Sequence, residues 1–166
     1  MNNSLTIIGA GAWGSALAIA LSDKFETIYL VTKDKENTDT LGNQHPALSK
    51  SFSDNIKLDS SYTVIQKSMA VLIATPSSCF SDVLNIIKDD IGQIPLAWVS
   101  KGFDPLSGNL LHETFIKLMN SHFPCVISGP TFAAEIVEQK PAAIVVASED
   151  KKTREFWSNI IQTKTL

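Results

Sequence analysis

Residues 5–14 read Leu5-Thr6-Ile7-Ile8-Gly9-Ala10-Gly11-Ala12-Trp13-Gly14, an apolar run that passes directly into three spaced glycines. The first four residues predict a buried strand, and the good helix formers of residues 12–21 predict a helix directly after it. A G-x-G-x-x-G segment is a weak signal alone. Its position between a strand and a helix makes it typical of a dinucleotide-binding unit.

Each of the three glycines has its own expected task. Gly9 would permit a tight turn, Gly11 would let the backbone approach a pyrophosphate, and Gly14 would let the helix pack close to the strand. The helix N-terminus would offer the pyrophosphate unpaired N–H groups and positive dipole charge. The alternative is that the glycines serve only a tight strand–helix turn.

The size and composition of the chain suit one ordinary folded domain. Its 166 residues can bury a core, and 44% hydrophobic against 19% charged residues excludes a disordered chain. The net charge of −3 argues against nucleic-acid binding. Cys79, Cys125 and the three scattered histidines show no zinc spacing, so no metal is expected. Both thiols are expected to be small buried hydrophobes in a reducing cytoplasm.

The apolar N-terminal segment, residues 5–21, raises the question of export or membrane insertion. It lacks the positively charged leading region of a signal peptide. Its glycines and Ser15 also leave it short of the ~20 strongly apolar residues that cross a bilayer. A buried strand, turn and helix explain the same residues, so no membrane span is expected.

Short apolar runs alternate with helical patterns along the whole chain, which predicts an α/β fold. Strands that are apolar on both faces indicate a largely parallel sheet with helices on both faces, of the Rossmann type. Residues 1–166 would form this one dinucleotide-binding domain, with an irregular loop at 42–54. The expected strands are residues 5–8, 27–31, 56–58, 69–75, 96–100, 125–128 and 143–147, and the expected helices are 12–21, 34–41, 60–68, 78–90, 109–119, 131–139 and 150–162.

The residues after the second strand, Thr32-Lys33-Asp34, would read the ribose of the cofactor. An NAD site usually has an acidic residue at the tip of this strand. Lys33 could instead pair with the 2′-phosphate of NADP, or be a solvated loop lysine. Asp34 could hold the ribose hydroxyls or cap the next helix. Trp13, inside the glycine loop, could shield the cofactor from water or pack in the core.

Three loops follow strand ends and should meet at the carboxyl edge of the sheet, where ligands bind in open α/β folds. They are residues 75–77, 100–102 and 128–131. Lys101 could contact an anionic substrate or orient a carbonyl, or it could be a strand-end lysine that reaches water. The Gly129 N–H and the Thr131 hydroxyl could bind substrate, or Thr131 could be a plain helix cap. The histidines, which lie far from these loops in sequence, are treated as structural or solvated: His45, His112 and His122.

Three segments in this order resemble the N-terminal half of prokaryotic-type NAD(P)-dependent glycerol-3-phosphate dehydrogenases. They are the glycine motif at residues 9–14, Ser100-Lys101-Gly102, and Ser128-Gly129-Pro130-Thr131-Phe132-Ala133-Ala134-Glu135. The last segment is the specific part of the resemblance, which covers essentially the whole chain. It implies reversible hydride transfer between dihydroxyacetone phosphate with NAD(P)H and sn-glycerol 3-phosphate with NAD(P)+, in phospholipid precursor synthesis.

The resemblance also implies roles for individual residues. Ala12, Trp13, Lys33 and Ala133 match cofactor-contacting positions, beside Gly9, Gly11 and Gly14 of the motif. Lys101 matches a position near both cofactor and substrate, and Gly129 and Thr131 match substrate-contacting positions. Ala12 stands where members often carry Ser, and the position of Lys33 varies in the family, which leaves the choice of NAD or NADP open.

The family is about twice the length of this chain, and its helical substrate domain carries the lysine proposed as general acid/base. We therefore expect a fragment that binds cofactor but turns over little alone, and a homodimer when full length. An apolar patch that includes Phe132 or Trp13 would be left exposed. Two other hypotheses stay open: a β-hydroxyacid dehydrogenase of similar architecture, and a non-catalytic dinucleotide-sensing module.

Overall fold

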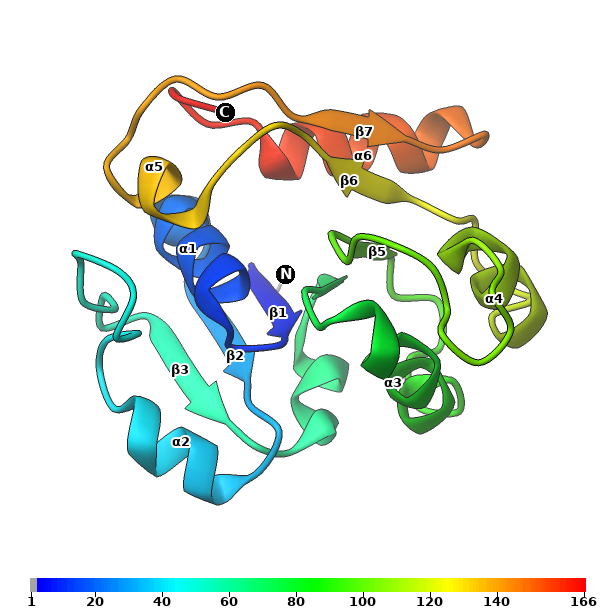
Figure 1. Cartoon of the computed structure of the whole chain (residues 1–166), viewed down its shortest axis with the longest axis horizontal. Helices are drawn as coiled ribbons and strands as arrows, with labels where there is room; N and C mark the ends of the chain where they lie inside the picture. The colour runs from blue at the N-terminus through cyan, green and yellow to red at the C-terminus, as the bar shows by residue number, and fades with distance from the viewer. Residues whose placement is uncertain (1–2) are drawn as a thin grey trace.

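A computed structural model describes residues 3–166 as one seven-stranded sheet with helices on both faces (Figure 1). The strand order is β3-β2-β1-β4-β5-β6-β7, and every neighbouring pair is parallel except β6 and β7. This order confirms the predicted Rossmann-type class. The strands are β1 (Ser4–Ile8), β2 (Thr27–Val31), β3 (Ile56–Asp59), β4 (Ala70–Ile73), β5 (Leu96–Trp98), β6 (Val126–Ser128) and β7 (Val145–Ala147).

Within residues 3–166, six α-helices and three 3-10 helices accompany these strands. Two of the 3-10 segments replace expected α-helix, at residues 62–67 and at the start of the helix expected from residue 78. The α-helices are α1 (Ala12–Leu21), α2 (Lys35–Leu41), α3 (Phe80–Ile87), α4 (Leu111–Leu118), α5 (Ala133–Val137) and α6 (Lys151–Ile161), and the 3-10 helices are η1 (Ser22–Lys24), η2 (Tyr62–Lys67) and η3 (Ser77–Cys79).

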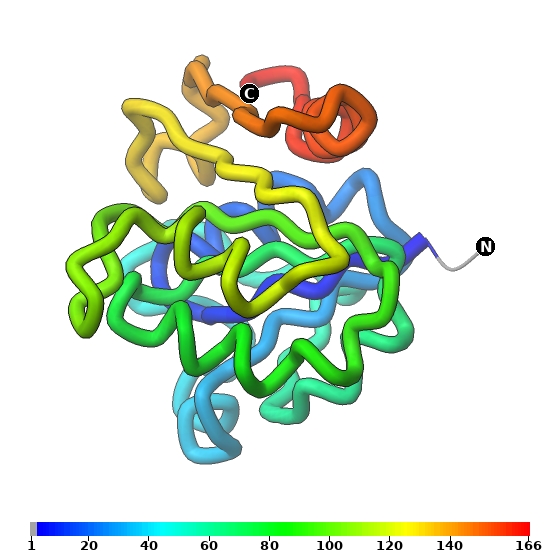
Figure 2. The backbone as a smooth tube through the Cα atoms, turned by 90° about the vertical axis from the view of Figure 1, so that its right-hand side faces the viewer, coloured from blue at the N-terminus to red at the C-terminus, as the bar shows by residue number. Residues whose placement is uncertain are grey.

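The central strands bury both of their faces, which explains their continuous apolar runs. On one face Leu5 and Ile7 pack in a core cluster with residues of α1 and α6. On the other face Ile8 packs with residues of α3, α4 and η2. Figure 2 shows α6 on one side of the sheet, opposite α3. Successive side chains of a strand point to opposite faces, so one strand serves both cores.

Trp98 of β5 fixes α3 and α4 against the second face of the sheet. Its ring lies 5.3 Å from the ring of Phe80 on α3 and 5.1 Å from the ring of Phe115 on α4. All three side chains are almost completely buried. Aromatic rings at such distances attract one another beyond the gain from burial.

The direction and edge position of the last strand are features that the sequence did not predict. β7 runs antiparallel to β6 at the edge of the sheet, and the Val145 side chain is 64% exposed. An apolar run such as residues 143–147 does not reveal strand direction or edge position, because both depend on the connection that precedes it. In the described part of the chain, residues 3–166, no helix is long and apolar enough to cross a membrane.

Candidate dinucleotide site at the carboxyl edge of the sheet

The turn between β1 and α1 needs glycine at two positions for reasons of packing. Gly9 has φ of +112°, a conformation that other residues rarely adopt, and a Cβ there would lie 2.8 Å from the carbonyl carbon of Ala74. A Cβ on Gly14 would lie only 1.9 Å from the carbonyl oxygen of Gly9. The chain after β4 and the first turn of α1 therefore both press against this turn, as expected for the outer glycines of the motif.

Gly11 differs from the other two glycines because the space around it is empty. A Cβ on Gly11 would meet no atom within 4 Å. Gly11 is also the N-cap of α1, and no side chain among residues 3–166 caps this helix. The start of α1 thus has no side-chain cap and has open space beside Gly11, which is an arrangement that can accept a phosphate group. The residues of the turn fit the pyrophosphate of a dinucleotide.

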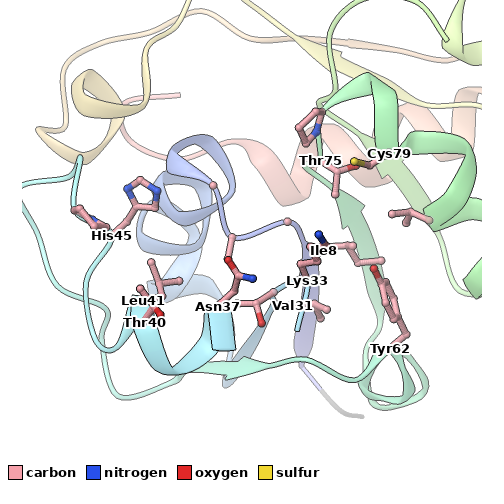
Figure 3. A pocket seen from close by; sticks show the side chains of 17 residues that line it. Ile8, Val31, Lys33, Asn37, Thr40, Leu41, His45, Tyr62, Thr75 and Cys79 are labelled. Carbon is pink, nitrogen blue, oxygen red and sulfur yellow. The ribbon is translucent and has the colours of Figure 1, made fainter. Parts of the chain in front are cut away.

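A cavity of about 460 Å³ adjoins the glycine turn. Figure 3 shows it between Asn37, Leu41 and His45 on one side and Tyr62, Thr75 and Cys79 on the other. Its size suits part of a dinucleotide. The lining residues are Ile8, Gly9, Ala10, Gly11, Val31, Thr32, Lys33, Asn37, Thr40, Leu41, His45, Pro46, Tyr62, Thr75, Pro76, Cys79 and Val83.

The charged character of this cavity is set at the end of β2. Lys33 lines the cavity, whereas Asp34 does not, and the lining residues include neither Asp nor Glu. Asp34 instead caps α2: its Oδ1 accepts hydrogen bonds from the backbone N–H of Asn37 at 2.9 Å and from Asn37 Nδ2 at 2.7 Å. These two bonds lower the pKa of the Asp34 carboxyl. Of the alternatives that the sequence leaves open for Asp34, the structure shows the cap.

His45 was expected to be structural or solvated, and the structure places it beside the cavity. It lines the cavity from the irregular loop after α2. Its Nδ1 accepts a hydrogen bond from the Ala47 N–H at 3.1 Å, which leaves Nε2 as the proton-bearing nitrogen of a neutral ring. No sequence signal could have found it, because its position depends on how a long loop folds back. For Asn37 and Thr40 a signal existed, since they lie one turn apart on the predicted helix.

The cysteines were also only partly predicted. Cys125 is buried, and burial raises the pKa of its thiol to about 12. Cys79, however, is exposed and lines the cavity, so the expectation of a buried thiol there was wrong. The residue lies where β4 gives way to α3, at the sheet edge rather than in the core. Residues 3–166 hold no group of three His, Cys, Asp or Glu side chains that could bind a metal.

The three strand-end loops meet, as predicted. Ser100 Oγ donates a 2.6 Å hydrogen bond to the carbonyl oxygen of Thr75, which joins the loop after β5 to the loop after β4. Lys101 Nζ donates a 3.2 Å hydrogen bond to the carbonyl oxygen of Gly129, which joins it to the loop after β6. The cavity lining therefore connects through Thr75 and Ser100 to Lys101, although Lys101 itself lies outside the lining.

Thr131 is not the cap of α5, so the capping alternative was wrong. Phe132 occupies the N-cap position without a side-chain hydrogen bond, and it is 72% exposed. The Thr131 side chain is only 9% exposed, yet Oγ1 has no hydrogen-bond partner within residues 3–166. A buried unpaired hydroxyl costs about 1–3 kcal/mol. The cost is recovered if a ligand atom supplies the missing partner.

Gly129 has a packing role that its sequence did not reveal. A Cβ on Gly129 would lie 2.2 Å from the carbonyl oxygen of Ala143. The chain before β7 thus closes over this residue, and any side chain would displace it. Glycine here is explained by packing even without a bound substrate.

Trp13 packs into the protein rather than standing free over the glycine loop. It is half-buried and contacts both the α1–α6 core and a small cluster that contains Ile136 and Val137 of α5. The predicted exposed patch therefore includes Phe132 but not Trp13. Ala133, the first residue of α5, belongs to the same small cluster. Helix α5, which follows the Gly129–Thr131 loop, is thereby packed on the helix that follows the glycine turn.

Comparison with known proteins identifies the family. Residues 4–154 match the family model described as NAD-dependent glycerol-3-phosphate dehydrogenase N-terminus. The chain belongs to this family. A relative from Vesicomyosocius okutanii, named glycerol-3-phosphate dehydrogenase (NAD(P)+), is 46% identical over 167 residues, covering 100% of this chain and 51% of the relative. A relative of the same name from Ruthia magnifica shows the same identity and coverage.

Solved structures agree with this family assignment. The crystal structure of glycerol-3-phosphate dehydrogenase from Coxiella burnetii superimposes with a TM-score of 0.90 at 26% identity. It covers 99% of this chain and 52% of that protein. The enzyme from Plasmodium falciparum, at 18% identity and a TM-score of 0.84, shows the same fold. The chain spans about half the length of the curated relatives it matches.

Proposed function

We propose that residues 1–166 form the dinucleotide-binding domain of an NAD(P)-dependent glycerol-3-phosphate dehydrogenase, with the family's helical substrate domain outside this chain. The enzyme would interconvert dihydroxyacetone phosphate and sn-glycerol 3-phosphate and thereby supply phospholipid synthesis. The observation that carries the proposal is the uncapped start of α1 with open space beside Gly11, next to a cavity connected through Thr75 and Ser100 to Lys101. A dinucleotide and a small substrate could meet at this edge of the sheet.

The glycine turn would hold the cofactor through its backbone. The free N–H groups after Gly11 would bind the pyrophosphate, with Ala12 and Gly14 shaping the turn, and Ala133 would lie beside the cofactor. The nicotinamide supplies or accepts a hydride when bound. Trp13 would keep the glycine turn rigid through its packing on α5. The rigid turn would keep the space beside Gly11 accessible to the pyrophosphate.

The loops after β5 and β6 would handle the substrate. Lys101, already 3.2 Å from the Gly129 carbonyl oxygen, would bind and polarise the substrate oxygen with its ammonium group. The unpaired Thr131 hydroxyl and the Gly129 backbone would orient the substrate. A proton relay and a phosphate clamp would come from the substrate domain, because ketone reduction needs both to orient and protonate the carbonyl.

The cavity favours NADP over NAD in this proposal. A 2′-phosphate carries negative charge and would meet Lys33, whereas no lining carboxylate is present to hold a free ribose 2′-hydroxyl. Asp34, the nearest candidate, is engaged as a helix cap. The Nε2–H of His45 is a second donor available from the other side of the cavity.

Calorimetric titration of the 166-residue chain with NADH and NADPH tests the proposed function. We expect saturable binding of both, tighter for NADPH, and no glycerol 3-phosphate-dependent NADH formation by the isolated chain. Binding of neither nucleotide would overturn the proposal for this chain. Clear turnover would show that no further domain is needed.

Two companion predictions concern the cell and the assembly. We propose that the protein is located in a reducing cytoplasm. Its two cysteines, both free in the described part of the chain, support this location. We also propose that the full-length protein is a homodimer, as the family resemblance implies. Sedimentation of the full-length protein would test the second statement, and a monomer would contradict it.

A further inference from the structure

Asp104 carries a buried carboxylate that has no role in the proposed mechanism. It lies three residues after Lys101, in the segment between β5 and α4, and is only 6% exposed. Among residues 3–166 it is the sole buried Asp, Glu, Lys or Arg. A buried carboxylate is tolerated only when hydrogen bonds replace its hydration, so its partners indicate what it holds in place.

The hydrogen bonds of Asp104 close its own loop and fasten that loop to α4. Oδ1 accepts from the Leu106 N–H at 3.0 Å, and Oδ2 accepts from Thr114 Oγ1 at 3.0 Å. The backbone of Asp104 is engaged as well: its N–H donates to the Asn109 carbonyl at 2.9 Å, and its carbonyl accepts from the Gly108 N–H at 2.8 Å. The residue is thus fixed at four atoms.

The turn between Lys101 and Asp104 leaves little freedom to the lysine backbone. Gly102 has φ of +107°, and a Cβ there would lie 3.4 Å from Ser77 Oγ, so this turn passes close to η3. On the other side of Lys101, Ser100 Oγ is bonded to the Thr75 carbonyl at 2.6 Å. Lys101 is therefore anchored both before and after, while its own side chain is exposed.

Such anchoring matters because the flexible lysine side chain does not by itself hold its ammonium group in one place. Its side chain has four rotatable bonds and loses rotamer entropy when it is held in one place. The anchored backbone fixes the position of the Lys101 Cα, from which the side chain extends so that Nζ reaches the Gly129 carbonyl oxygen. A loop that swung freely would spread Nζ over many positions.

We propose that Asp104 is a positioning residue that, with Thr114, holds Lys101 at the strand ends where cofactor and substrate would meet. The proposal rests on the proposed function for the role of Lys101 itself. It does not make Asp104 a catalytic residue, since the carboxylate is turned into the loop and α4 and faces no ligand cavity. Its effect travels through the backbone of residues 101–104.

The direct test observes Lys101 in the intact 166-residue chain. Reductive ¹³C-methylation labels every lysine, and Lys101→Arg identifies the Lys101 resonance. We expect Asp104→Asn and Thr114→Val to move this resonance toward the value of a free lysine and to leave the other lysine resonances in place. Glu113→Gln, which neutralises an exposed carboxylate on the same helix, is the matched control and should change nothing.

Cofactor affinity supplies the second readout. Asp104→Asn should weaken NADPH binding about as much as Lys101→Met does, and the double variant should show no additional loss, because both changes act on one group. Asp104→Glu should restore part of the affinity. Fully additive losses, or an unmoved Lys101 resonance in a folded Asp104→Asn variant, would overturn the proposal.

The two readouts separate this inference from the proposed function. If the wild-type chain binds no nucleotide, the proposed function of this chain fails, while the Lys101 resonance still decides the positioning role. If Asp104→Asn does not fold, as its thermal unfolding would reveal, Thr114→Val decides instead, because it removes a single donor and keeps the shape of the side chain. An unmoved Lys101 resonance in Thr114→Val then overturns the positioning role.

Discussion

Lys101 Nζ lies 3.2 Å from the carbonyl oxygen of Gly129, although 28 positions separate the two residues in the chain. The loops after β5 and β6 end at the same edge of the sheet because the two strands are parallel neighbours. This contact brings the lysine to the segment that contains Thr131. It joins two motifs that the sequence shows only as separate turns.

Gly11 and Gly14 should respond in different ways to alanine. Gly14→Ala places a Cβ 1.9 Å from the Gly9 carbonyl oxygen, so we expect a loss of about 3 kcal/mol or more in stability. For a chain of this size that is roughly 6–12 °C in Tm. Gly11→Ala should fold normally and bind NADPH about tenfold more weakly. Thermal unfolding and calorimetry check both; unchanged affinity in Gly11→Ala would exclude the glycine turn as the pyrophosphate site.

Lys33 should determine the preference for the phosphorylated cofactor. Lys33→Asp removes a cation from the cavity and adds an anion, so the affinity for NADPH should fall by about tenfold or more, as for the loss of a charged hydrogen bond. The affinity for NADH should hold or rise, since a carboxylate can accept from the ribose hydroxyls. Lys35→Asp, just beyond on the exposed start of α2, is the control for net charge. Equal NADPH binding by wild type and Lys33→Asp would mean that Lys33 is only solvated.

The free energy of unfolding of the ligand-free chain should be lower with Thr131 than with valine at this position. Thr131→Val removes the buried hydroxyl that lacks a partner, so the ligand-free chain should gain about 1 kcal/mol in stability. Thr131→Ser keeps the hydroxyl and loses a buried methyl group, and it should be destabilised by a similar amount. Urea unfolding measures both. In the full-length protein Thr131→Val should raise KM for glycerol 3-phosphate; a more stable Thr131→Ser would contradict this account.

Acid should destabilise the chain through three carboxylates that accept backbone N–H bonds. The pKa of Asp34, Asp104 and Asp150 lies below the usual range, because hydrogen bonds from Asn37, Leu106 and Thr153 favour the charged forms. A depressed folded-state pKa gives stability that is present above the unfolded value of about 4 and is lost as the pH falls through the folded value.

Urea unfolding at pH 7, 4 and 3 measures this loss of stability in acid. Asp150→Asn removes one titrating group and leaves an oxygen that can accept from the Thr153 N–H, now 2.7 Å from Oδ2. The variant should therefore lose less stability between pH 4 and pH 3 than the wild type. An identical loss in the wild type and in Asp150→Asn would show that Asp150 does not contribute to the loss of stability in acid.

The exposed apolar side chains near the strand ends should make the isolated chain self-associate. Leu106 is 89% exposed, Phe132 72% and Phe103 59%, all in the loops that follow β5 and β6. Large exposed apolar groups favour association. Sedimentation velocity should show concentration-dependent oligomers, and Leu106→Ser with Phe132→Ser should reduce them. Val145→Ser, at the β7 edge, separates this surface from edge-strand pairing.

Most of the fold follows from local patterns in the sequence. Apolar runs and helical periodicity predicted the order of strands and helices, because side-chain direction in each element has a fixed period. The context of Gly9, Gly11 and Gly14 predicted the turn and its place at the sheet. The 3-10 segments differ from the prediction because a helical pattern does not distinguish the tighter turn in short pieces.

The sequence by itself determined the α/β class, the glycine turn and the family to which the chain belongs, since these depend on contacts between near neighbours and on ordered motifs. Only the tertiary structure decided which distant groups meet: His45 against the cavity, Lys101 against Gly129, and Asp104 against Thr114. It also decided that Asp34 caps a helix and that the Thr131 hydroxyl is buried without a partner. The physical reason is that loop paths and strand pairing bring together residues that no local period relates.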